Sequence, residues 1–200
     1  MGLKLFFKRD TMEAGCDEAG RGCLAGPVFA ASVILDSKKI ITGLDDSKKL
    51  SEKKRNDLRK EIEDKALSFG VAMLNNMEID KVNILKASFL AMHAAIDKLE
   101  HEPELLLIDG NRFIPYKKIK HECIVKGDGK YQSIAAASIL AKTYRDEFMQ
   151  KIHEEFPDYG WIHNKGYPTA DHRTSIRKFG ATKYHRMTFT LLNDQLSLEL

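Results

Sequence analysis

A continuous apolar run at Leu105–Ile108 is the feature that most constrains how this chain can fold. Pro103 lies shortly before the run and Asp109-Gly110 directly after it, so the run has the length of a strand and ends in a turn. A strand that is apolar on both faces must be covered on both faces. The run therefore predicts a central strand of a sheet that is buried beneath helices.

Strand and helix patterns elsewhere in the chain fit that requirement. Alternating or β-branched segments bounded by turn residues predict further strands at residues 13–16, 28–35, 71–74 and 121–125. The first two are joined by a glycine-rich connection, which can be tight because glycine tolerates positive φ. Helical spacing and cap residues predict helices at residues 51–66, 83–99, 132–155 and 169–179. The predicted fold class is α/β, a mixed β-sheet flanked by helices.

Composition favours a globular chain without a membrane span or a disulfide framework. At 200 residues we expect one domain with room for a small appendage. No apolar run approaches the roughly 18 residues of a membrane span, and the N-terminal segment is too short for a signal peptide, so a cytoplasmic location is expected. The three cysteines, Cys16, Cys23 and Cys123, form no C-x-x-C pair, which predicts reduced, mostly buried thiols.

Four carboxylates occupy positions from which a sheet could bring them together. Asp17 and Glu18 are adjacent at the end of a predicted strand, whereas Asp109 ends the apolar run and Asp128 precedes the helix predicted at 132–155. Gathered carboxylates repel one another and are costly to bury, and a divalent cation relieves both costs. Two such ions roughly 3.5–4 Å apart suit phosphodiester hydrolysis. Taken singly, Asp109 could instead cap a turn and Asp128 could cap the helix.

Two further patterns are open to more than one interpretation. Adjacent residues of a strand point to opposite faces, so Asp17 and Glu18 reach one metal region only through a bend or a backbone carbonyl. Residues 161–190 carry six Lys or Arg against one acid, which fits a phosphate-facing surface or a solvated basic helix. Histidine-metal, serine-hydrolase and nucleotide-loop motifs are not present in the sequence.

A series of short motifs, in order along nearly the whole chain, resembles ribonuclease HII. In this sequence they are Asp17-Glu18-Ala19-Gly20-Arg21-Gly22, Ala25-Gly26-Pro27-Val28, residues 45–51, Ile108-Asp109-Gly110, Lys126-Gly127-Asp128, residues 133–142, Gly166-Tyr167-Pro168-Thr169 and His185-Arg186. The resemblance implies a ribonuclease H-like fold with a helical C-terminal extension. On that basis we expect a catalytic domain at residues 1–155 and a basic helical extension packed on it at residues 156–200.

The resemblance also implies roles for individual residues. It implies a four-carboxylate site for Mg²⁺ or Mn²⁺ made by Asp17, Glu18, Asp109 and Asp128. It further implies that Gly20, Arg21 and Gly22 grip the 2′-hydroxyl of a ribonucleotide and the adjacent phosphates, and that Tyr167 senses the same hydroxyl. Ser47 and Lys48, together with Lys142 and Arg145, are further candidates for phosphate contact. Asp146 matches a recurrent acid of the family, either structural or a competitor of Asp128 for the fourth ligand position.

The activity implied by the resemblance is endonucleolytic cleavage of the RNA strand in RNA/DNA hybrids. Incision at ribonucleotides embedded in duplex DNA is implied as well, with 5′-phosphate and 3′-hydroxyl products. Separately, we expect a monomeric protein with no membrane partner. The intact acidic set disfavours a non-catalytic RNA–DNA binding module, because uncompensated carboxylates would repel phosphate. A related metal nuclease for branched DNA is the third alternative, and it would need no sensor of the 2′-hydroxyl.

Overall fold

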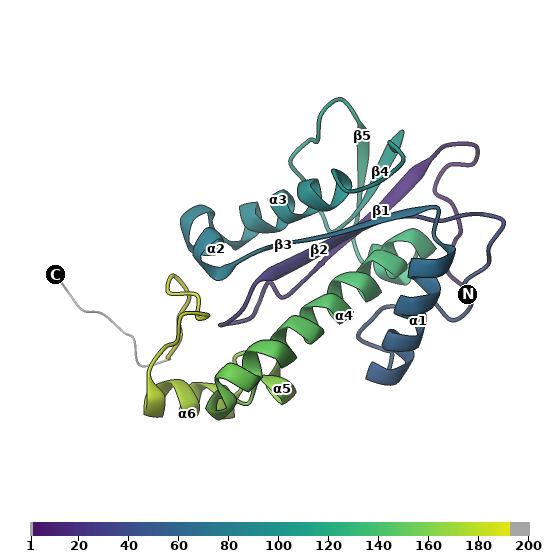
Figure 1. Cartoon of the computed structure of the whole chain (residues 1–200). Helices are drawn as coiled ribbons and strands as arrows, with labels where there is room; N and C mark the ends of the chain where they lie inside the picture. The colour runs from purple at the N-terminus through teal and green to yellow at the C-terminus, as the bar shows by residue number, and fades with distance from the viewer. Residues whose placement is uncertain (1, 193–200) are drawn as a thin grey trace.

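A five-stranded mixed sheet forms the centre of the computed structural model, which describes residues 2–192 (Figure 1). Its strands are β1 Glu13–Ala19, β2 Val28–Ile34, β3 Ser68–Leu74, β4 Leu105–Asp109 and β5 Lys120–Ile124. The strands lie in the order β3-β2-β1-β4-β5. Antiparallel pairing joins the first three in this order, and parallel pairing joins β1 to β4 and β4 to β5. The predicted α/β class and mixed sheet are confirmed.

Helices cover both faces of this sheet (Figure 1). Helices α2 Asn76–Val82 and α3 Ile84–Ile96 lie on one face, and α1 Glu52–Lys65 and α4 Gln132–Glu155 lie on the other. Alternate residues of the strands enter the two apolar clusters, as Ala30 packs with α3 while Ala31 packs with α1 and α4. At Gly15 an added Cβ would lie 2.2 Å from the backbone of Ser133. Glycine therefore allows α4 to lie directly against β1.

Most predicted elements are present with small shifts of their ends. The long helix has the predicted bounds, and the apolar run Leu105–Ile108 is buried within β4. Strand β1 continues to Ala19, three residues past its predicted end, so Asp17 and Glu18 lie on the strand itself. The short helix α2 was missed, and the predicted thiols are free, with Cys16 and Cys23 buried.

The C-terminal segment packs around the end of α4. It contains the short helices η2 Pro157–Tyr159 and α5 Trp161–Asn164, then α6 Ala170–Phe179, which Thr169 caps and after which Gly180 follows. Its buried side chains share one cluster with α4 and with the loop after β1: Leu24, Ala25, Met149, Ile152, Tyr159, Trp161, Ile176 and Leu191. The boundary at residue 155 stays a prediction, and residues 193–200 of the expected extension lie outside the described residues.

Two smaller features complete the description. The 3-10 turn η1 Gly127–Gly129 connects β5 to α4 and carries Asp128. Over residues 2–192, no helix combines the length and the apolar character needed to cross a bilayer.

Candidate active site

The parallel strands β1 and β4 place Asp17 and Asp109 side by side. Cys16 pairs with Ile108 in the β1–β4 register, so the next residue on each strand is one of these two acids. Cys16 and Ile108 face the α3 cluster, and alternation therefore turns Asp17 and Asp109 toward the opposite face, which α4 covers. The carboxyl ends of two adjacent parallel strands thus bring together acids that are 92 positions apart in the sequence.

The turn η1 brings Asp128 to the same end of the sheet. The Gly127 amide donates a hydrogen bond of 2.7 Å to Oδ1 of Asp109, which ties this turn to β4. Asp128 accepts from the Gly129 amide at 2.9 Å and is 6% exposed. The N-cap of α4 is Tyr131, without a side-chain cap, so Asp128 does not cap the long helix.

Burial and mutual repulsion oppose the ionisation of three of these acids. Burial, followed by the nearby charges of Glu18 and Asp109, holds the pKa of Asp17 well above its usual range, and a hydrogen bond from Ser138 opposes this shift. Burial also raises the pKa of Glu18, against the opposing charge of Arg21, whose Nη1 lies 3.1 Å from Glu18 Oε1. The end of the sheet is therefore a place where added positive charge is stabilising.

Asp128 and Lys48 belong to the same electrostatic group. Burial and then the carboxylates of Asp109 and Asp46 raise the pKa of Asp128. Burial lowers the pKa of Lys48, but the surrounding carboxylates outweigh it and raise the value: Asp46, Asp128, Asp17 and Asp109. In the part of the chain that the structure describes, no three His, Cys, Asp or Glu side chains are gathered closely enough to hold a metal ion as they stand. The four acids are neighbours rather than a preformed coordination sphere.

A cavity of about 320 Å³ opens beside Asp17 and Glu18. Most residues predicted to contact substrate line it, namely Gly20, Arg21, Gly22, Ser47, Lys48, Lys142 and Tyr167, and Ser138 lines it as well. The Ser47 hydroxyl is buried and lies 3.0 Å from the Ser138 hydroxyl. Asp17 and Glu18 both line the cavity from the end of β1, although adjacent side chains of a strand point to opposite faces.

Two fully buried arginines hold the loop that follows β1 from behind. Arg186 donates to the carbonyl oxygens of Gly20 at 2.7 Å and Arg21 at 2.9 Å. Arg145 donates to the carbonyls of Ala25, Pro27 and Lys165. The expectation that Arg145 contacts a phosphate is therefore wrong, because its guanidinium is committed to backbone groups and is inaccessible.

The direction of these carbonyls decides where the loop amides point. In a trans peptide the N–H lies opposite the preceding C=O, and cis peptides are absent from the described chain. Since the carbonyls of Gly20 and Arg21 face Arg186, the N–H groups of Arg21 and Gly22 point away from it. Both residues line the cavity, so the arrangement suits an acceptor such as a phosphate oxygen.

A histidine pair fixes the backbone beside Tyr167. Trp161 Nε1 donates to His172 Nε2 at 3.0 Å, and His172 Nδ1 lies 2.9 Å from the Tyr167 carbonyl. The Thr182 amide donates to His185 Nδ1 at 2.8 Å, and His185 Nε2 lies 3.3 Å from His172 Nε2. One set of neutral tautomers satisfies all four contacts, with His172 protonated at Nδ1 and His185 at Nε2. Accordingly, burial lowers the pKa of both rings, that of His185 to about 4.

Several cations of the basic stretch at 161–190 have structural roles. Arg186 is buried, Arg173 donates to the carbonyls of Thr190 and Leu191, and Lys183 pairs with Glu155. These three side chains stabilise the C-terminal segment itself. Sequence reasoning missed the buried arginines, although His185-Arg186 stands among the matching motifs.

Comparisons with known proteins identify the family of this chain. A family model described as ribonuclease HII matches residues 14–192. The ribonuclease HII of Christiangramia forsetii is 61% identical over 194 residues, covering 97% of this chain and 98% of its own. That of Parabacteroides distasonis is 61% identical over 193 residues, covering 96% and 97%.

Solved structures with the same fold include archaeal relatives. The ribonuclease HII in a complex with PCNA from Archaeoglobus fulgidus has a TM-score of 0.78 at 28% identity, covering 92% of this chain and 98% of that one. Ribonuclease H2 from Pyrococcus horikoshii has a TM-score of 0.74 at 26% identity, covering 90% and 94%. The extended match to the family model and the high identity to full-length relatives lead to one assignment: this chain belongs to the ribonuclease HII family.

Proposed function

We propose that this protein is an endoribonuclease that cleaves the RNA strand of RNA/DNA hybrids and incises duplex DNA at embedded ribonucleotides. Products would carry 5′-phosphate and 3′-hydroxyl ends. The observation that carries the proposal is the meeting of Asp17 and Asp109 at the carboxyl ends of parallel strands, next to a cavity lined by Gly22 and Tyr167. Membership of the ribonuclease HII family supports the hybrid substrate.

The proposed ligands of two divalent cations are Asp17, Glu18, Asp109 and Asp128. The donor set fits Mg²⁺ or Mn²⁺, because carboxylate oxygens are hard ligands and because burial and repulsion leave these acids in need of positive charge. Two such ions, when bound, supply an activated water and charge stabilisation for the leaving 3′ oxygen. The protein's acids hold the ions and take no nucleophilic part.

The cavity residues would bind and select the substrate. The Arg21 and Gly22 amides and the Lys48 ammonium can donate to phosphate oxygens. The Tyr167 ring, 40% exposed, offers a flat surface for a ribose and a hydroxyl for its 2′-OH. DNA lacks that group, so this contact would distinguish a ribonucleotide from a deoxyribonucleotide.

A substrate panel tests the proposal. We expect cleavage of a labelled RNA/DNA hybrid and of a duplex with one ribonucleotide, in Mg²⁺ or Mn²⁺, and none of an all-DNA duplex. Cleavage rates in Mg²⁺ and in Mn²⁺ would define the preferred ion. Cleavage rates on the hybrid and on the duplex with one ribonucleotide would define the preferred substrate. Equal cutting of all-DNA substrates would favour a branched-DNA nuclease. Hybrid binding that survives EDTA without cleavage in either metal would indicate a binding module instead.

A further inference from the structure

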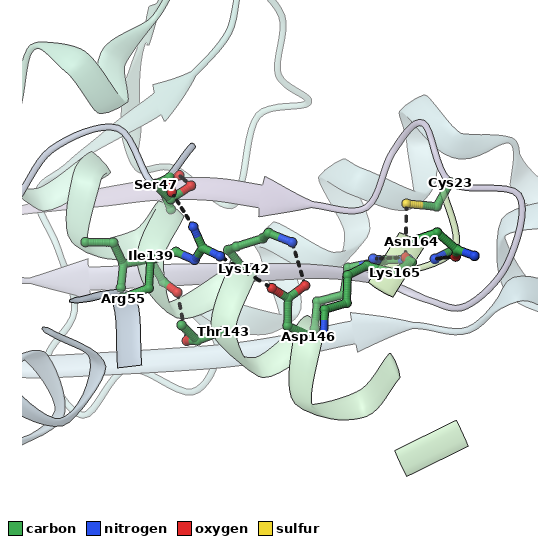
Figure 2. Close-up of polar contacts among 12 residues, drawn as sticks. Cys23, Ser47, Arg55, Ile139, Lys142, Thr143, Asp146, Asn164 and Lys165 are labelled. Carbon is green, nitrogen blue, oxygen red and sulfur yellow. Dashed lines mark hydrogen bonds and ion pairs between the residues drawn. The ribbon is translucent and has the colours of Figure 1, made fainter. Parts of the chain in front are cut away.

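A nearly buried carboxylate, Asp146, contacts Lys142, which is one of the residues that line the cavity (Figure 2). It is 8% exposed and sits one turn after Lys142 on α4. Lys142 Nζ lies 2.5 Å from Asp146 Oδ1, and Lys142 also lines the cavity. Lys142 therefore connects the buried Asp146 carboxylate with the cavity in which substrate would bind.

The same carboxylate is close to a second cation, Arg55, which bonds to the loop that carries two other residues of the cavity lining. Arg55 of α1 lies with its Nη2 4.0 Å from Asp146 Oδ2, and its side chain is 13% exposed (Figure 2). Arg55 Nη1 donates to the carbonyls of Ser47 at 3.0 Å and Leu50 at 2.5 Å. Asp146 is thus linked through Lys142 to the cavity directly, and through Arg55 to the loop that carries Ser47 and Lys48.

Asp146 is poorly placed to be a ligand of the metal site. It lies eight residues beyond Ser138, the residue that contacts Asp17, which is about 12 Å along the helix axis. Both of its oxygens face cations instead. Of the two roles that the sequence left open for Asp146, this position favours the structural one over that of fourth metal ligand.

We propose that Asp146 is a positioning residue that orients the Lys142 ammonium toward a phosphate of the bound nucleic acid. This inference rests on the proposed function. A lysine side chain is long and flexible, so a free Lys142 would occupy many rotamers. An ammonium has three donors, and the bond to Asp146 uses one, which leaves two for phosphate oxygens. The buried pair therefore presents a preorganised cation at the cavity wall.

A double-mutant cycle of Asp146→Asn and Lys142→Ala tests the inference through the Kd for an RNA/DNA hybrid. The Kd is measured by fluorescence anisotropy in EDTA, and KM and kcat are measured separately in Mg²⁺. Asp146→Asn should raise Kd and KM by about 5- to 20-fold, with kcat changed less than about 2-fold. In the Lys142→Ala background, Asp146→Asn should raise Kd by less than about 2-fold further, because the Lys142 ammonium through which Asp146 acts is missing. Equal effects in both backgrounds would overturn the inference.

The chain supplies a matched control in Lys53 and Asp57, a pair with the same i, i+4 spacing on α1 that is exposed and does not line the cavity. Asp57→Asn should leave Kd, KM and the salt dependence of binding unchanged. Asp146→Asn should reduce the slope of log Kd against log salt by about 1, as loss of one phosphate contact would. A merely structural role would lower the melting temperature without changing that slope.

Two outcomes remain to be separated. If Asp146→Asn does not fold, Lys142→Gln alone decides, since wild-type affinity and salt slope in that variant would overturn the inference. Cleavage by the wild-type protein in the same assay reports on the proposed function. If the wild-type protein cleaves the hybrid but the effects of the two substitutions on Kd are additive, only the role of Asp146 is wrong. If the wild-type protein does not cleave but the two substitutions are coupled, only the proposed enzymatic function is wrong.

Discussion

Two glycines of the same loop are needed for different reasons. Gly20 has φ of +98°, and a Cβ there would lie 2.0 Å from Arg145 Nε. Gly22 has no such φ, and no atom lies within 4 Å of the position of its Cβ. Packing therefore requires glycine at position 20, while at position 22 only the approach of a ligand could require it.

Alanine substitutions should separate these two requirements. Gly20→Ala should lower the free energy of unfolding by roughly 2–4 kcal/mol, because the left-handed backbone and the clash with Arg145 are both costly. Gly22→Ala should unfold at the wild-type urea midpoint yet lose about 10-fold or more in hybrid affinity. Destabilisation of Gly22→Ala to the same extent would contradict the assignment of this residue to substrate binding.

Tyr167 allows a second test at the same scale. Its side chain is half-exposed, so Tyr167→Phe removes a hydroxyl without leaving a cavity. Cleavage at a single embedded ribonucleotide should fall by about 10-fold or more relative to hybrid binding, since one hydrogen bond to the 2′-hydroxyl is lost. A uniform loss on every substrate would count against a sensor of that hydroxyl.

The elements with a simple pattern could be predicted from sequence, and those that depend on distant partners could not. The apolar run of β4 and the capped helix α1 follow local rules. The end of β1 was missed because Gly and acidic residues are rare in strands, yet pairing with β2 holds Asp17 and Glu18 extended.

The same limit applies to the site. Four acids were identified from their positions in the sequence and the resemblance implied their joint role, but the tie between Asp109 and the Gly127 amide depends on tertiary structure. Burial of Arg145 and Arg186 could not be predicted, because arginines are usually exposed and these two bind carbonyls that leave no trace in the sequence. Lys142 and Asp146 stand four residues apart on a predicted helix, so their contact, unlike its role, follows from spacing.

The C-terminal segment should be sensitive to acid through its histidine pair. Both rings have a folded pKa below the unfolded value near 6.5, so their contribution to stability is complete above pH 6.5 and is lost as pH falls; for His185 the loss continues to about pH 4. Between pH 7 and 5 the free energy of unfolding of the wild-type protein should fall by roughly 2 kcal/mol more than that of His185→Gln, measured by urea unfolding. The difference between the two proteins isolates His185 from the acids of the cavity, and identical pH slopes would contradict this account.

At the scale of the whole molecule, the C-terminal segment is part of the site rather than an accessory. Residues 24–26 bond to residues 184–186 through the Gly26 amide and the Arg186 amide. The segment also supplies the Arg186 guanidinium behind the loop and Tyr167 in the cavity lining. We propose that residues 1–155 form a catalytic domain and residues 156–200 an extension of it, and that the two parts unfold in one transition.

Cleavage of an RNA/DNA hybrid by Asp109→Asn in Mg²⁺ tests the central claim most directly. Asn keeps the size of the side chain and an oxygen that can accept from the Gly127 amide, so the variant should unfold at nearly the wild-type temperature. We expect its cleavage rate to fall by a factor of about 1,000 or more, because a negative charge proposed to hold the cations is lost. A folded variant that cleaves the hybrid at the wild-type rate would contradict the account.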